Sequence, residues 1–264
     1  MNEKIRFISR FVYHSLKARS KFDLHSPFVY HVYSKILKDK SDYPEYRIMN
    51  AHWEKLLHDQ RYISRIDLGA RGSDVPWQKK ILSIRKLSHD CSVGPHFGRL
   101  LFRIVRYFKP GLTLELGTSL GLSTAYMAFG NPEGKIITLE GSAPIAAEAE
   151  RNFEHLGLVN IDQRIGRFDD ELPGILKEVD HFDLVFIDGN HKKEATMKYF
   201  QLLLEHLMAG SILIIDDIHW SKGMEEAWKE ISAHPKVKVT MDLFRMGLVF
   251  FRDELSKEDF TIHY

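Results

Sequence analysis

The chain has 264 residues, of which 44% are hydrophobic and 28% charged, and its formal net charge is +1. This composition is that of a globular protein, and the near-neutral charge gives the whole molecule no electrostatic reason to seek nucleic acid or a membrane. The single cysteine, Cys91, excludes an internal disulfide, and no apolar run reaches the roughly 18–20 residues that cross a bilayer. We therefore expect a cytoplasmic protein without a signal peptide or transmembrane segment.

Residues 1–90 follow a mostly helical pattern, and we expect a helical extension or cap there, in front of a second domain at residues 91–264. Ser26-Pro27 predicts the start of one helix, with serine as the N-cap and proline in the first turn. The glycine-containing stretch 67–74 resembles a ligand-binding loop. The preceding stretch, Tyr62–Ile66, is interrupted by polar residues, so we predict no strand before it and interpret the stretch as an ordinary loop.

Residues 1–21 are strongly basic, with six lysines and arginines against one acidic residue, Glu3. An amphipathic helix of this kind can bind RNA or an anionic membrane. More commonly its apolar stripe packs on the domain or on a second subunit, and we favour that interpretation.

After residue 110, short apolar runs alternate with helical stretches, which is typical of a parallel, doubly wound α/β sheet. Seven strands are expected, at Leu112–Leu116, Lys135–Glu140, Asn160–Ile165, Phe182–Ile187, Ser211–Asp216, Val237–Met241 and Gly247–Phe251. Only Asp242–Met246 separates the last two strands, which is too short for a helical crossover. They should form an antiparallel hairpin, so the expected fold is a Rossmann-like sheet of seven strands with the last one antiparallel.

A glycine loop follows the first of these strands and precedes a helix, where it can bring backbone N–H groups close to an anionic ligand. The loop residues are Gly117, Thr118, Ser119 and Gly121. The loop has no third glycine for a dinucleotide and no Gly-Lys-Ser/Thr for a P-loop. It does match the Gly-x-Ser-x-Gly elbow of serine hydrolases, so a hydrolase with Ser119 as nucleophile remains an alternative.

Two glutamates accompany the loop. Glu115 lies two residues before Gly117, and Glu140 ends the next strand, where a carboxylate can accept both ribose hydroxyls of an adenosine ligand. The third strand is followed by Gly166 and Phe168, whose backbone and ring could border an adenine.

Three further carboxylates follow buried strands, Asp188 after the fourth and Asp216 and Asp217 after the fifth. The carboxyl ends of neighbouring parallel strands form the ligand crevice, so these side chains should converge and bind a hard cation such as Mg²⁺ or Ca²⁺. His191, three residues after Asp188, is placed to act as a general base. Alternatively, Asp188 contacts only the cofactor, Asp217 caps a turn and His191 is a surface residue.

Residues 92–251 resemble the class I S-adenosylmethionine-dependent methyltransferases, in particular the catechol O-methyltransferase-like group and the bacterial O-methyltransferases with an Asp-Gly-x-His motif. That motif is Asp188-Gly189-Asn190-His191 here, and the seven-strand layout also fits the group. The resemblance implies that Glu115 and Gly117 hold the methionine amino group of the cofactor and that Ser123 binds its carboxylate.

The resemblance further implies that Glu140 binds the ribose and that Phe168 and Asp169 flank the adenine. Asp188, Asp216 and Asp217 match the magnesium ligands of that group, and His191 stands where the catechol enzymes have a lysine base. The implied reaction is methyl transfer to a small-molecule hydroxyl, by an enzyme that is often a homodimer. An RNA-modifying methyltransferase remains the other alternative, with residues 1–21 as the binding arm.

Overall fold

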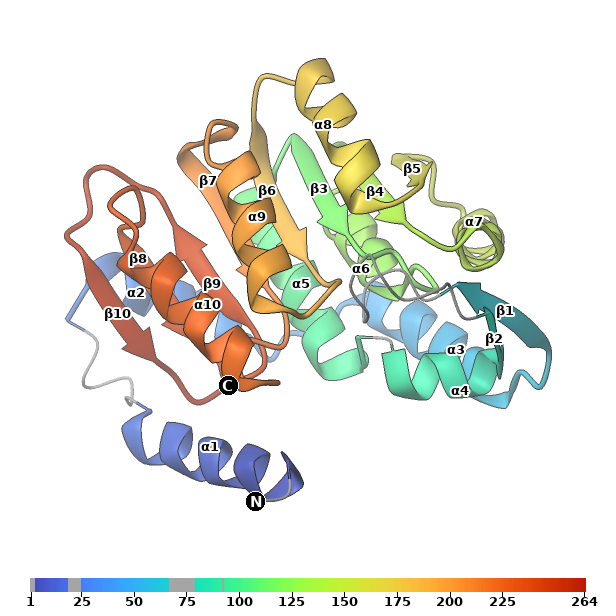
Figure 1. Cartoon of the computed structure of the whole chain (residues 1–264), viewed down its shortest axis with the longest axis horizontal. Helices are drawn as coiled ribbons and strands as arrows, with labels where there is room; N and C mark the ends of the chain where they lie inside the picture. The colour runs from blue at the N-terminus through green and yellow to red at the C-terminus, as the bar shows by residue number, and fades with distance from the viewer. Residues whose placement is uncertain (1–2, 19–24, 67–78, 92) are drawn as a thin grey trace. The chain divides into compact units, whose positions relative to one another are not determined.

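The computed structural model describes residues 3–18, 25–66, 79–91 and 93–264 (Figure 1). The chain divides into two compact units, one of residues 38–175 and one that joins residues 1–37 to residues 176–264. The predicted boundary at residue 90 does not coincide with this division and stays a prediction. The glycine-containing stretch 67–74 lies outside the described residues.

The unit of residues 38–175 contains the first three strands of the expected parallel sheet. These are β3 (Leu112–Leu116), β4 (Lys135–Glu140) and β5 (Ile161–Ile165). All pair in parallel, with Leu112 opposite Lys135 and Ile136 opposite Ile161, so their carboxyl ends lie at one edge. Its helices are α3 (Pro44–His58), α4 (Ile84–Cys91), α5 (Pro95–Phe108), α6 (Leu122–Gly130), α7 (Ala143–Leu156) and the start of α8 (Phe168–Glu178).

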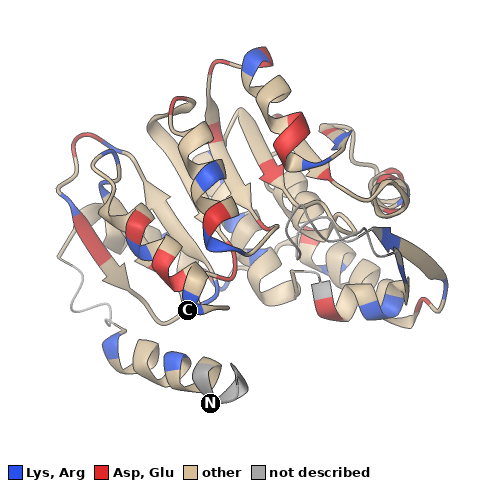
Figure 2. Cartoon of the chain, in the orientation of Figure 1, with Lys and Arg blue, Asp and Glu red and all other residues tan. Residues whose placement is uncertain are grey.

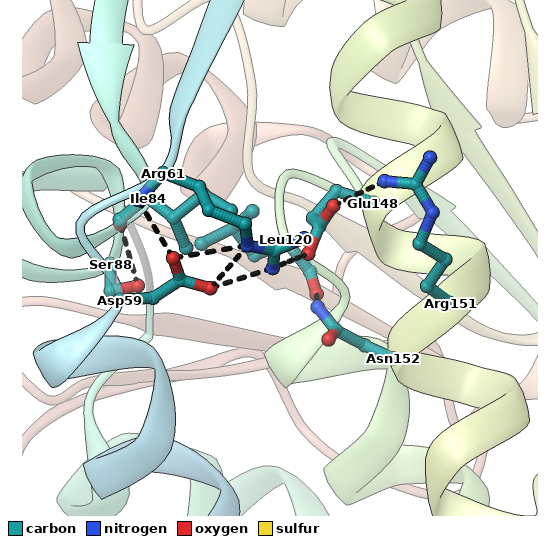
Figure 3. Close-up of polar contacts among 8 residues, drawn as sticks. All are labelled: Asp59, Arg61, Ile84, Ser88, Leu120, Glu148, Arg151 and Asn152. Atoms are coloured by element: carbon teal, nitrogen blue, oxygen red, sulfur yellow. Dashed lines mark hydrogen bonds and ion pairs between the residues drawn. The ribbon is translucent and has the colours of Figure 1, made fainter.

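A two-stranded antiparallel ladder in this unit corrects the sequence analysis. Tyr62–Ile66 does form a strand, β1, which pairs with β2 (Lys79–Ser83). Apolar residues of both strands are exposed, with Tyr62 76% and Ile81 68% accessible, so the ladder has little apolar alternation. Just before β1, the guanidinium of Arg61 bridges Asp59 to Glu148 on α7, at 2.6 and 2.5 Å (Figure 3).

The other unit contains the remaining strands, β6 (Phe182–Ile187), β7 (Leu207–Ile215), β8 (Val239–Asp242), β9 (Gly247–Phe250) and β10 (Glu258–Thr261). β6 pairs in parallel with β7, and β9 runs antiparallel to both β7 and β8, as the predicted hairpin requires. β10 pairs in parallel with β8 and was not predicted. Apart from the β1–β2 ladder, the described residues therefore hold eight strands instead of seven.

The helices of this unit are α1 (Glu3–Lys17), α2 (Pro27–Val32), the π-helix Tyr33–Leu37, α9 (Lys193–Leu203) and α10 (Lys222–Ala233). α2 starts as predicted, with the Ser26 hydroxyl as N-cap and Pro27 in the first turn. Both acidic and basic residues lie along α9 and α10 (Figure 2). Lys193 of α9 pairs with Glu226 and Glu230 of α10. No helix in the described part of the chain is long and apolar enough to span a membrane.

α1 contacts the unit to which it belongs. Phe7 and Phe11 meet the Phe244 ring edge-on, at centroid distances of 5.2 and 5.0 Å. Arg10 pairs with Glu225 at 2.9 Å, and the ammonium group of Lys17 lies 4.4 Å from the centroid of the Tyr13 ring. Ile8, Val12 and Leu16 nevertheless remain 60%, 51% and 81% exposed, so the packing interpretation and the RNA-binding arm both stay predictions.

Candidate active site

The glycine loop after β3 is held against β4 by backbone hydrogen bonds. The amides of Gly117 and Thr118 both donate to the carbonyl of Leu139, at 3.0 and 3.1 Å. Gly117 and Gly121 have φ of 117° and 80°, the region that glycine adopts without steric cost. Gly121 is the N-cap of α6 and provides no side chain to cap it, so the first amides of this helix point into the loop.

Glu115 lies beneath this loop with its carboxylate completely buried. Ser123 donates to Oε1 at 2.6 Å, Thr138 donates to Oε2 at 2.6 Å, and the Thr124 hydroxyl also donates to Oε2. The proton of Thr138 is used in that bond, so the Thr118 hydroxyl must donate to Thr138, at 2.6 Å. Burial raises the pKa of Glu115 to about 7, although the three hydroxyl groups oppose the shift.

This network shows the surroundings of two residues of the predicted cofactor site, Glu115 and Ser123. Glu115 is enclosed by hydroxyl groups of its own unit. Ser123 is 4% exposed and points its hydroxyl at Glu115 instead of outward. Both residues therefore connect β3, β4 and the start of α6, and their roles in binding a cofactor stay predictions.

Glu140, at the end of β4, is partly exposed and faces the loop. Its Oε2 accepts the backbone N–H of Ser119 and its Oε1 accepts that of Ser142, both at 2.9 Å. Burial raises the pKa of Glu140, and the two N–H groups oppose this by stabilising the charged form. The carboxylate is thus held in one orientation, as a ribose-binding acceptor must be.

The third part of the predicted cofactor site follows β5. The Gly166 amide donates to the carbonyl of Glu140 at 3.0 Å, which brings the chain after β5 close to the end of β4. Phe168 and Asp169, in the first turn of α8, are both partly exposed. Glu140, Gly166, Phe168 and Asp169 therefore lie along one edge of β4 and β5, and their roles in binding a cofactor stay predictions.

The predicted acidic cluster is present in the other unit. Asp216 is 1% exposed at the end of β7, and Asp188 follows β6 with 16% of its side chain exposed. Burial, then Asp216 and Asp217, raise the pKa of Asp188 well above its usual value. Burial and Asp216 also raise the pKa of Asp217, against the influence of His191 and Arg245.

His191 lies beside this cluster, as the sequence predicts. Its Nε2 is 3.7 Å from Asp188 Oδ1 and 4.0 Å from Asp217 Oδ2, and 29% of its side chain is exposed. The imidazole is therefore accessible and lies beside two carboxylates. This geometry suits a general base, which must hold the proton that it removes.

Arg245, which the sequence analysis missed, also belongs to the cluster. Its Nε donates to Asp216 Oδ1 and Oδ2 at 3.1 and 3.3 Å, and its Nη2 donates to Oδ2 at 3.0 Å. Nε also lies 3.9 Å from Asp217 Oδ1. Burial opposes the charge of Arg245, but Asp216, Asp217 and Asp188 outweigh it and raise the pKa of the guanidinium.

These contacts do not fit the predicted magnesium site. Both oxygens of Asp216 face a guanidinium, and a guanidinium and a divalent cation cannot share the same carboxylate positions without strong repulsion. Among the described residues, no group of three histidine, cysteine or acidic side chains is arranged to hold a metal ion. The three carboxylates meet as predicted, but an arginine supplies their counter-charge.

Comparison with known proteins shows which class of protein the central part of the chain resembles. Residues 114–218 match the family described as a methyltransferase domain. Catechol O-methyltransferase of Niastella koreensis is 35% identical over 130 residues, which cover 48% of this chain and 58% of that protein. The probable O-methyltransferase Rv1703c of Mycobacterium tuberculosis is 32% identical over 139 residues, covering 48% and 58% of the two chains. The chain thus spans less than two thirds of the length of these relatives.

Solved structures show the same fold. The Bacillus cereus O-methyltransferase in complex with SAH (S-adenosylhomocysteine) has a TM-score of 0.54 and 26% identity, covering 61% of this chain and 83% of that one. The SAH-bound methyltransferase PaMTH1 of Podospora anserina has a TM-score of 0.61 and 17% identity, covering 89% and 100%. Residues 114–218 therefore match a methyltransferase domain, and the fold is similar to that of SAH-bound O-methyltransferases.

Proposed function

We propose that this protein transfers the methyl group of S-adenosylmethionine to a hydroxyl oxygen of a small molecule. The observation that carries the proposal is the bond between the Ser119 amide and Glu140, in a domain that matches methyltransferases. It fixes a carboxylate suited to ribose hydroxyls beside a loop of backbone donors suited to a carboxylate. A serine hydrolase would require neither feature.

The loop and the residues beside it would each bind a different part of the cofactor. The amides at the start of α6 would bind the methionine carboxylate, and Gly117 would let the backbone approach the amino end closely. Glu140 would accept the ribose hydroxyls, and Phe168 and Asp169 would flank the adenine. Glu115 and Ser123 act from beneath by holding the loop.

The bound sulfonium supplies an activated methyl group, so the protein has to align the acceptor and take up one proton. When bound, the cofactor would give its methyl group to the acceptor oxygen, and the electron pair of the broken carbon–sulfur bond would stay on sulfur. His191 would receive the proton of the acceptor hydroxyl, and Asp188, 3.7 Å from its Nε2, would orient the imidazole.

Relatives named catechol O-methyltransferases support a phenolic hydroxyl as the first acceptor class to test. The full chain would be incubated with methyl-labelled S-adenosylmethionine and panels of catechols, sugars and carboxylic acids. We expect acceptor-dependent label transfer that His191→Ala lowers by about 10²–10⁴-fold. The control is His181→Ala, an exposed histidine of the same unit, which should leave the rate unchanged.

Absence of transfer to every class would contradict the acceptor proposal, and absence of SAH binding would contradict the cofactor proposal. We propose no role for Mg²⁺ in the reaction, because Arg245 occupies both carboxylate oxygens of Asp216. The cytoplasmic location and the homodimer stay predictions from the sequence.

A further inference from the structure

The acidic cluster contains its own cation at a fixed place. The Arg245 guanidinium engages both oxygens of Asp216, a carboxylate that is 1% exposed, and approaches Asp217 to 3.9 Å. Two-point contacts between arginine and a carboxylate are among the strongest hydrogen-bonded pairs in proteins. The position where a cation would meet Asp216 is therefore already taken by a side chain.

Two hydrogen bonds fix the backbone around Arg245. In the β8–β9 turn, Oδ1 of Asp242 accepts the amide of Phe244 at 2.9 Å, and Phe244 has a left-handed φ of 70°. The Arg245 carbonyl accepts the amide of Ile218 at 3.1 Å, which ties the turn to the residues just after Asp217. Arg245 is thus part of a structured turn that leads its side chain to Asp216.

The strand register explains why this turn meets the acidic cluster. Ile215, the last residue of β7, lies opposite Gly247, the first residue of β9, in an antiparallel ladder. Asp216 follows Ile215 and Arg245 precedes Gly247 by two residues, so the two side chains emerge at the same edge. The juxtaposition follows from the strand pairing and does not depend on a mobile surface contact.

We infer that Arg245 takes the place of a divalent cation in the acidic cluster, so that the proposed methyl transfer is independent of metal. The claim that methyl transfer needs no metal rests on the proposed function. The claim that Arg245 replaces a cation rests only on the contacts of Arg245. The arginine neutralises part of the charge of Asp188, Asp216 and Asp217 and keeps Asp216 oriented. It is a positioning residue, and its effect is to repel any divalent cation that approaches these carboxylates.

The test is to measure Mn²⁺ binding by electron paramagnetic resonance in the full chain, in Arg245→Met and in Arg245→Lys. Wild type should leave Mn²⁺ free at millimolar concentration. Arg245→Met should bind one Mn²⁺ at least about tenfold more tightly, because one unit of repulsive charge is removed. Arg245→Lys keeps the charge and should bind no better than wild type. Asp216→Asn added to Arg245→Met should abolish the gain.

Arg252→Met is the matched control, because Arg252 lies in the same unit and pairs with the exposed Glu254. It should behave as wild type. SAH titrations with Mg²⁺ and with EDTA form the second arm, and wild-type affinity should be equal in both. Micromolar binding of Mn²⁺ by wild type, loss of SAH affinity in EDTA, or equal gains in the Met and Lys variants would each overturn the inference.

These experiments test the proposed methyl transfer and the role of Arg245 independently of each other. If SAH binds under no condition, the proposed function is wrong, but the Mn²⁺ result still judges the role of Arg245. If Arg245→Met does not fold, the wild-type and Arg245→Lys measurements alone decide the outcome.

Discussion

The backbone amide of Ser119 donates a 2.9 Å hydrogen bond to Oε2 of Glu140, and this bond joins the glycine loop to the end of the neighbouring strand β4. Ser119 adopts a left-handed φ of 49°, which turns its amide toward Glu140. The bond fixes the loop and the carboxylate relative to each other. Preorganisation of this kind reduces the entropy lost on binding.

Gly121→Ala tests whether the loop tolerates a side chain at the start of α6. A Cβ there would lie 2.4 Å from the Phe153 ring, and φ is 80°. We expect a loss of about 2–4 kcal/mol in the free energy of unfolding, from strain and crowding together, and weaker SAH binding.

Gly157→Ala is the matched control for Gly121→Ala. Gly157 also has a positive φ, of 69°, but a Cβ there meets no atom within 4 Å. It should cost only the backbone strain, roughly 1 kcal/mol. Urea unfolding of the two variants measures the difference, and equal losses would show that Phe153 does not crowd the loop.

Glu115→Gln should change how stability depends on pH. The folded pKa of Glu115, about 7, lies above the unfolded value, so the protonated carboxyl favours the folded state. This contribution is complete below pH 4.5 and is lost as the pH rises to 7. Wild type should therefore lose about 2–3 kcal/mol relative to Glu115→Gln between those pH values. Parallel stability curves would contradict the raised pKa.

His52 should have the opposite effect to Glu115 and make the folded state less stable as the pH falls. It is 4% exposed on α3, and burial, followed by His155 and Lys55, lowers its pKa to about 4. In the unfolded chain, His52 has a pKa of about 6.5 and becomes protonated below that pH, whereas in the folded protein it stays neutral down to about pH 4. The free energy of unfolding therefore falls as the pH drops toward 4.

His52→Leu should remove this dependence, flattening the stability curve between pH 6.5 and 4 by about 2–3 kcal/mol. The exposed His58, on the same helix, provides the control variant His58→Leu. Urea unfolding at several pH values would measure both. If His52→Leu retains the slope of wild type, another group causes it.

Ser119→Ala separates methyl transfer from the hydrolase alternative. The bond to Glu140 comes from the backbone of Ser119, so removal of the hydroxyl leaves it in place. We expect SAH affinity to change by less than about threefold, within the range of small surface effects. Labelling of wild type by a fluorophosphonate, lost in Ser119→Ala, would instead favour the hydrolase.

The alternation of strands and helices after residue 110 is predictable from apolar periodicity, and the structure confirms it in each unit. β10 is not predictable in this way, because only Phe260 of Glu258–Thr261 is buried and the strand is held by backbone pairing with β8. β1 was not predicted because it too is held by backbone pairing with another strand. Its partner is supplied by another segment of the chain, and its own residues show no clear period.

The acidic cluster could be predicted because its members all follow strands that end at one edge. Arg245 could not, because its nearness to Asp216 depends on the register of β9 against β7. The burial of Glu115 also required the structure, since its hydroxyl partners come from β4 and α6. A basic residue in a short hairpin next to acidic strand ends is the signal that would have pointed to Arg245.

The central claim is that Glu140 and the loop beside it bind the cofactor, and calorimetric titration of SAH into the full chain tests it most directly. We expect micromolar binding, weakened by about 1–3 kcal/mol in Glu140→Ala. Glu150→Ala, an exposed position on α7 of the same unit, should bind as wild type does. Absence of binding at millimolar SAH, or equal affinity in wild type and Glu140→Ala, would contradict the account.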